Sequence, residues 1–124
     1  MATPLHLLAK VRSDRIMASA MGQPCSLRIA SFVPGRRCSG VDTTVGTHLP
    51  VFGKGMSTKV TDMAVAYGCH ACHQIIDGPD KEARDYIFKH FPAAVVERML
   101  HGLVETHCRL IEDGIINIPD GELI

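Results

Sequence analysis

The sequence predicts a small α+β domain in which a bound metal replaces part of the hydrophobic core. Three observations support this: short β-type segments between residues 25 and 67, a cysteine and histidine knuckle at 69–73, and helical periodicity over residues 80–113. The chain has 124 residues, of which 46% are hydrophobic and 5% aromatic, so it can form one domain with a mostly aliphatic core. We divide it into a basic N-terminal arm, residues 1–22, and a metal-braced domain, residues 23–124.

Three segments before the knuckle are strand candidates. Residues 25–30 alternate polar and apolar side chains, and residues 41–48 are rich in β-branched types. Residues 60–67 form a third candidate strand or a short buried segment. A Pro-Gly turn at residues 34–37 leads into Cys38.

Two helices are expected after the knuckle. The first covers residues 80–88, with Pro79 near its first turn, and the second begins at Pro92 and ends at Gly114. Apolar residues at three- and four-residue steps give the second helix an amphipathic stripe. We expect this stripe to serve either the core or a homodimer interface. Its members are Val95, Val96, Met99, Leu100, Leu103, Val104, Leu110 and Ile111.

Charge is segregated along the chain, although the formal net charge is zero. Residues 1–60 contain eight Lys and Arg against two acids, and residues 61–124 contain five against eleven. A basic half of this kind suits a polyanionic partner such as nucleic acid. The residues expected to contact its phosphates are Arg36, Arg37, Lys54 and Lys59.

No apolar run approaches the length of a membrane span, so no membrane partner is expected. The charged residues Lys10, Arg12, Asp14 and Arg15 interrupt any secretory leader. We therefore expect a cytoplasmic protein. In that compartment, five cysteines favour metal binding or free thiols over disulfides.

Four of the cysteines are candidate ligands of a structural zinc ion. Cys69 and Cys72 have the two-residue spacing that binds one metal from a single tight turn. Cys25 and Cys38 lie upstream, each at or beside a turn, and four thiolates would close a tetrahedral site to substrate. The wide gap between these two leaves open that either is a buried small hydrophobe. Cys108, on the long helix, is expected to be a packed free thiol.

The knuckle also permits another interpretation. Residues 69–73 spell C-x-x-C-H, the attachment signature of c-type haem. That alternative requires export and an axial ligand such as Met56 or Met63, and it leaves the two upstream cysteines unexplained.

Three further residues predict a chemical site. His73 and Asp77 are four residues apart, so a helix through them places both on one face. A metal-dependent phosphodiesterase needs a base for water and a cation for the phosphate. His48, at the end of a strand candidate, would be the base facing the His73 and Asp77 pair. The alternatives are an exposed histidine at position 48 and a helix N-cap at Asp77.

Three parts of the sequence resemble a known family. Residues 58–77 carry T-K-x-x-D, six residues, and then C-x-x-C-H-x-x-I-D. This pattern resembles the HNH-type nucleases carried by prophages, the YbcO-like family. Residues 25–29 with Cys38 look like that family's first cysteine pair, and residues 112–116 look like the end of its last helix. The resemblance covers about residues 15–118.

The resemblance implies the ββα-metal core of HNH nucleases, braced by the four-cysteine zinc and followed by C-terminal helices. It places the general base at His48 and the ligands of a catalytic Mg²⁺, Mn²⁺ or Zn²⁺ ion at His73 and Asp77. The chain's only asparagine is Asn117, so Asp62 is the candidate substitute for the motif's Asn and a further metal ligand. The implied activity is metal-dependent endonucleolytic cleavage of DNA.

A second function fits the same residues. Many HNH enzymes have an acidic or histidine ligand just before the base, where this chain has Thr47. Thr47 therefore favours a non-catalytic, zinc-stabilised nucleic-acid-binding accessory protein in recombination. Such a protein would bind DNA in a salt-sensitive way without metal-dependent cleavage.

Overall fold

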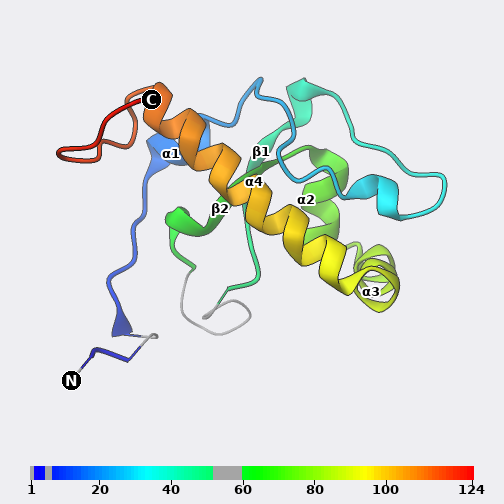
Figure 1. The fold of residues 1–124 in the computed structure, drawn as a ribbon. Coiled ribbons are helices and arrows are strands. Elements are labelled where there is room, and N and C mark those ends of the chain that lie inside the picture. Colours follow the sequence, from blue (N-terminus) through cyan, green and yellow to red (C-terminus); the bar gives the residue numbers. More distant parts are fainter. Residues whose placement is uncertain (1, 5–6, 52–59) are drawn as a thin grey trace.

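The computed structural model, described here for residues 2–4, 7–51 and 60–124, is a small α+β domain (Figure 1). Its described residues form a two-stranded sheet and four α-helices, which confirms the prediction of a small α+β domain. The elements in order are α1 (Asp14–Ala18), β1 (Val45–His48), β2 (Val65–Gly68), α2 (His70–Ile76), α3 (Lys81–His90) and α4 (Pro92–Glu112). Short 3-10 helices occur at Ala30–Phe32, Val41–Thr43 and Asp62–Ala64.

Strands β1 and β2 are antiparallel and lead directly into α2. Their register pairs Val45 with Gly68 and His48 with Val65. All four residues of β2 are buried, and α4 crosses the sheet in front of this strand (Figure 1). The hydroxyl of Thr106 on α4 accepts the Tyr67 N–H at 3.0 Å, which joins the helix to β2. The start of β1 therefore lies beside the start of α2, and the end of β1, at His48, lies near Asp77 at the C-terminal end of α2.

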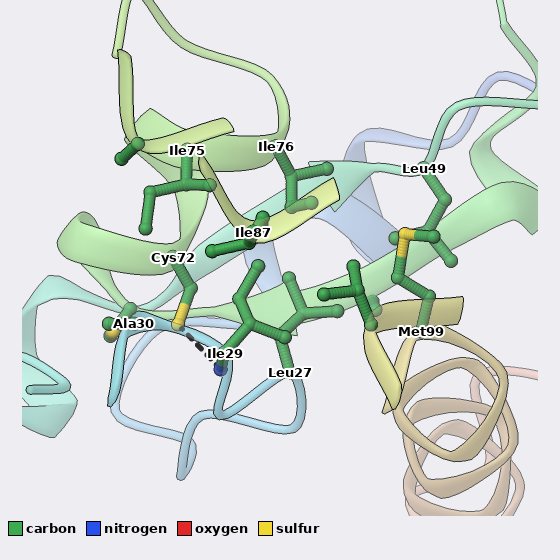
Figure 2. Close-up of a cluster of buried hydrophobic side chains, with 13 residues drawn as sticks. Leu27, Ile29, Ala30, Leu49, Cys72, Ile75, Ile76, Ile87 and Met99 are labelled. Atoms are coloured by element: carbon green, nitrogen blue, oxygen red, sulfur yellow. Dashed lines mark hydrogen bonds between the residues drawn. The ribbon is translucent and has the colours of Figure 1, made fainter. Parts of the chain in front are cut away.

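The core draws side chains from loops, from β2 and from the three helices that follow the sheet (Figure 2). Aliphatic side chains come from α2, α3 and α4 and from the loop before the first 3-10 helix, as the composition predicted. Two cysteines are fully buried within the same cluster. The cysteine knuckle is therefore part of the core. The labelled members in Figure 2 are Leu27, Ile29, Ala30, Leu49, Cys72, Ile75, Ile76, Ile87 and Met99.

The apolar stripe of α4 is divided between the core and the surface. Val95, Met99 and Leu110 are buried, together with the small residues Gly102 and Thr106. One edge of the expected stripe is more than half exposed: Val96, Leu100 and Val104. The buried edge thus confirms the core role expected for the stripe.

Gly102 allows α4 to pack closely on the loop after Cys25. A methyl group at this position would lie 2.9 Å from the Ser26 carbonyl oxygen, well inside contact distance. We expect Gly102→Ala to lower the free energy of unfolding by about 1–3 kcal/mol, because the backbones must separate. The intrinsic helix preference for alanine, about 1 kcal/mol, acts in the opposite direction. Denaturant unfolding would measure the net effect.

The matched control is Glu97→Ala, an exposed position on the same helix. It should change the free energy of unfolding by less than about 0.5 kcal/mol. A Gly102→Ala protein at least as stable as this control would contradict the close-packing argument.

The N-terminal segment contacts the sheet before the chain reaches the first cysteine. The Ser13 hydroxyl accepts the Ile16 N–H at 3.1 Å and so caps α1. Ile16 and Ala20 are buried, and α1 packs against β1. Residues 11–20 of the predicted arm therefore lie on the domain.

The prediction of a strand over residues 25–30 is wrong. Arg28 has φ of +50°, a left-handed conformation that interrupts any strand, and a 3-10 helix begins at Ala30. The Arg28 and Ile29 N–H groups point to cysteine sulfurs, where a strand would direct them to a neighbouring strand. The other two candidates are strands only in their second halves, because each begins with a 3-10 turn.

Candidate functional site

The four predicted zinc ligands lie together. The sulfur atoms of Cys25, Cys38, Cys69 and Cys72 are all within 4.8 Å of one another. Cys69 is the N-cap of α2, and Cys72 lies one turn into that helix. The other two cysteines arrive from the loops on either side of the first 3-10 helix. Residues separated by more than forty positions in the sequence thus form a single group that can hold a metal ion.

The spacing of the sulfur atoms fits a tetrahedral zinc site. Four sulfurs at about 2.3 Å from one zinc ion would be about 3.8 Å apart from each other. The Cys38 and Cys72 sulfurs are 3.8 Å apart. No c-type haem is needed to explain the C-x-x-C-H sequence, because both of its cysteines face the two upstream cysteines.

Backbone N–H groups are directed at three of the sulfur atoms. The N–H groups of Arg28, Ile29 and Ser39 point at Cys25, Cys72 and Cys69, with nitrogen to sulfur distances of 3.4, 3.4 and 3.3 Å. Figure 2 shows the contact between Ile29 and Cys72. Such donors stabilise the negative thiolate that binds a metal. The loops are therefore shaped for metal-bound sulfur.

Without a cation, the cysteine cluster can hold little negative charge. A hydrogen bond from Cys72 lowers the pKa of Cys25 to about 4, and donating that bond, together with burial, raises the pKa of Cys72. Burial, followed by the nearby charge of Cys25, raises the pKa of Cys38 to about 12. At neutral pH the cluster would keep protons on Cys38 and Cys72, and metal binding would release them.

A second group of polar side chains lies at the end of β1. His48 contacts Asp62, with 2.8 Å between Nε2 and Oδ1. On its other side, Nδ1 of His48 is 3.9 Å from Oδ2 of Asp77. His73 approaches the same Asp77 oxygen through Nε2 at 4.0 Å. The structure therefore brings together the four residues that were expected to form the chemical site.

The elements explain this convergence. His48 is the last residue of β1, and the register places it opposite the first residue of β2. His73 is on α2, and Asp77 is the C-cap of that helix, so the alternative of an N-cap at Asp77 is wrong. Asp62 lies in the 3-10 helix just before β2. One short strand, the 3-10 helix before the second strand and one α-helix hold all four side chains.

Asp62 is ionised at neutral pH. Burial acts to raise its pKa, but hydrogen bonds from the Ser13 N–H and His48 outweigh burial and leave the pKa below the usual value. Only 8% of the residue is exposed. A buried carboxylate with two donors is a fixed negative charge beside the histidine.

Two of the four residues expected to contact nucleic acid, Arg36 and Arg37, lie within the described ranges. Lys54 and Lys59 lie outside the described residues. Arg37 is exposed, and Arg36 forms an ion pair with Asp80, the N-cap of α3. Cys108 is a free thiol, as predicted, but the prediction that it is packed is wrong, because it is exposed on α4.

The sequence model of one protein family, described as "Putative nuclease YbcO", matches residues 14–108. The chain belongs to the YbcO family. The YbcO match begins with α1 and extends into the last turns of α4, so it contains both groups of side chains. The description of the YbcO family indicates nuclease activity, which implies a nucleic-acid substrate. The chain has no match among curated proteins or solved structures. Within the described ranges, no helix has the length and apolar character of a membrane span.

Proposed function

We propose that this YbcO-family chain is a metal-dependent endonuclease of the HNH type, of the kind found in phages and prophages, and that it cleaves DNA. The observation that carries the proposal is the position of His48. This histidine lies at a strand end, with Nδ1 3.9 Å from Asp77 on the neighbouring helix. Strand, strand and helix follow one another in the ββα order expected for such a site.

His48 would act as the general base. In its neutral form an imidazole has one nitrogen with a lone pair, which can accept a proton from water. The side chain is 26% exposed, so it can meet a substrate while remaining held by the protein. The deprotonated water would attack the phosphorus atom, and the leaving oxygen would depart on the opposite side.

His73 and Asp77 would hold the divalent ion. Nε2 of His73 and Oδ2 of Asp77 are 4.0 Å apart, and an imidazole nitrogen and a carboxylate oxygen are both ligands of divalent ions. Two protein ligands leave positions for water and phosphate oxygens, as is usual for Mg²⁺. When bound, the ion would supply a Lewis acid that stabilises charge on the phosphate and the leaving oxygen.

The four-cysteine zinc would have a structural role. Its four sulfur ligands would leave no position for substrate. It would join the loops around Cys25 and Cys38 to the start of α2, the helix that carries His73. The exposed arginines at positions 36 and 37 would then contact the DNA backbone.

A cleavage assay tests the proposal. We expect the purified protein to cut DNA when Mg²⁺ or Mn²⁺ is added, and to stop when the ion is chelated. Asp77→Asn should reduce kcat by about 10²-fold or more, because it weakens the only charged ligand of the pair. The control is Asp85→Asn, an exposed carboxylate on α3 that pairs with Lys81.

The accessory-protein alternative gives a different result in the same assay. The protein would bind DNA with an affinity that falls steeply with salt, and no metal would induce cleavage. Salt-dependent binding without any cleavage, across the divalent ions tested, would contradict the proposed activity.

A further inference from the structure

Both carboxylate oxygens of Asp62 are engaged by the protein itself. Oδ1 lies 2.8 Å from Nε2 of His48, and Oδ2 accepts the Ser13 backbone N–H at 2.6 Å. The residue is almost completely buried. A carboxylate held in this way on two sides has little freedom to turn toward a metal ion.

The N-terminal segment holds this carboxylate in place through its backbone. The Asp62 N–H donates to the Val11 carbonyl at 2.8 Å, and the Val11 N–H donates to the Thr61 hydroxyl at 3.0 Å. Residues 11–13 thus run beside residues 61–62 and bond to both the backbone and the side chain of Asp62. Ser13 also caps α1, whose residue Ile16 is buried, so the anchor is attached to the core.

We propose that Asp62 is a positioning residue, anchored by residues 11–13, which fixes His48 in the tautomer with its proton on Nε2. The role of this tautomer in cleavage rests on the proposed function, whereas the assignment of the tautomer rests only on the contact between Asp62 and His48. Asp62 was expected to substitute for the motif's asparagine and to ligate metal, and the inference gives it a different role.

The chemistry of the contact determines the tautomer. An ionised carboxylate has acceptors only, so the imidazole nitrogen at 2.8 Å must donate. A neutral ring with its proton on Nε2 has its lone pair on Nδ1. That nitrogen is the one on the side of Asp77 and His73. Asp62 therefore directs the basic nitrogen toward the proposed cleavage site.

Asp62→Asn tests the inference with almost no change in shape. Its amide oxygen can still accept the Ser13 N–H, while its NH₂ group faces Nε2 of His48. An NH₂ donor favours the tautomer with the proton on Nδ1, which removes the lone pair from the cleavage side. We expect kcat to fall by about 10²–10⁴-fold with little change in KM, as for other histidines placed in the wrong tautomer.

The direct readout is imidazole ¹⁵N NMR of the purified protein at mildly alkaline pH, without an added divalent ion. Comparison with His48→Ala assigns the His48 signals. Wild type should show the proton on Nε2, Asp62→Asn should show it on Nδ1, and Asp85→Asn should match wild type. A merely structural role for Asp62 would not exchange the two nitrogens.

Two results would overturn the inference: a wild-type His48 protonated on Nδ1, or an Asp62→Asn protein with unchanged tautomer and kcat. The wild-type spectrum alone decides the first result. The proposal can therefore be overturned even if the Asp62→Asn protein does not fold. If wild type cleaves no nucleic acid, the proposed function fails, and the spectrum still decides the tautomer.

Discussion

Cys72→Ser is expected to abolish binding of the proposed zinc ion and to unfold the domain. Cys72 is fully buried in the core, and its sulfur receives the Ile29 N–H (Figure 2). Zinc binding to structural sites has an apparent free energy of about 10–16 kcal/mol, comparable with or larger than the total stability of a typical domain, about 5–15 kcal/mol. Elemental analysis should find about one zinc per chain in wild type and none in the variant. Circular dichroism should show loss of the cooperative thermal transition.

Cys108→Ser provides the matched control, since it makes the same substitution on an exposed thiol. This variant should keep the zinc and melt within about 2 °C of wild type. A Cys72→Ser protein that retained both metal and transition would refute the four-cysteine site. A wild-type protein with bound iron and a Soret band would instead support the haem alternative.

The helices were predictable because their signals are local. The period of the apolar residues over 92–111 and the glycine at 114 indicate a helix that ends near its observed terminus at Glu112. The two-residue spacing of Cys69 and Cys72 likewise fixes a tight turn from nearby residues alone. In these segments, the conformation of each residue follows from residues that lie within one or two helical turns of it.

The loop around residues 25–30 was not predictable in this way. Its alternating pattern is typical of a strand, but the N–H groups of two of its residues point at cysteine sulfurs. One sulfur belongs to the nearby Cys25 and the other to Cys72, which is far away in the sequence. These contacts to sulfur, and not a neighbouring strand, accompany the left-handed conformation of Arg28. Periodicity carries no information about such contacts.

The docked N-terminal segment was missed for a related reason. Its bonds to Thr61 and Asp62 join residues 49 to 51 positions apart. No short motif in residues 11–13 indicates those partners, and basic residues on both sides suggest a solvated arm. His48, His73 and Asp77 were easier to place together because they lie on only two elements, β1 and α2, whereas the contact from Asp62 depends on a 3-10 turn.

His48→Gln is expected to abolish DNA cleavage while leaving the fold intact. Glutamine can still offer an N–H to Asp62, so the buried carboxylate keeps a donor, but it has no basic nitrogen to accept a proton from water. General bases contribute about 10²–10⁴-fold to rate, and kcat should fall by at least that amount. By contrast, His48→Ala should lose cleavage and also about 1–3 kcal/mol of stability, because the buried Asp62 loses one of its two donors.

Comparison of the two variants separates chemistry from folding. Both should retain zinc, and both should be equally inactive although their melting temperatures differ. The control is His101→Ala, an exposed histidine on α4, which should cleave and melt as wild type does. If either His48 variant cut DNA at the wild-type rate, another group would have to activate the water. The assignment of His48 as the base would then be wrong, even with the four-cysteine site and the fold unchanged.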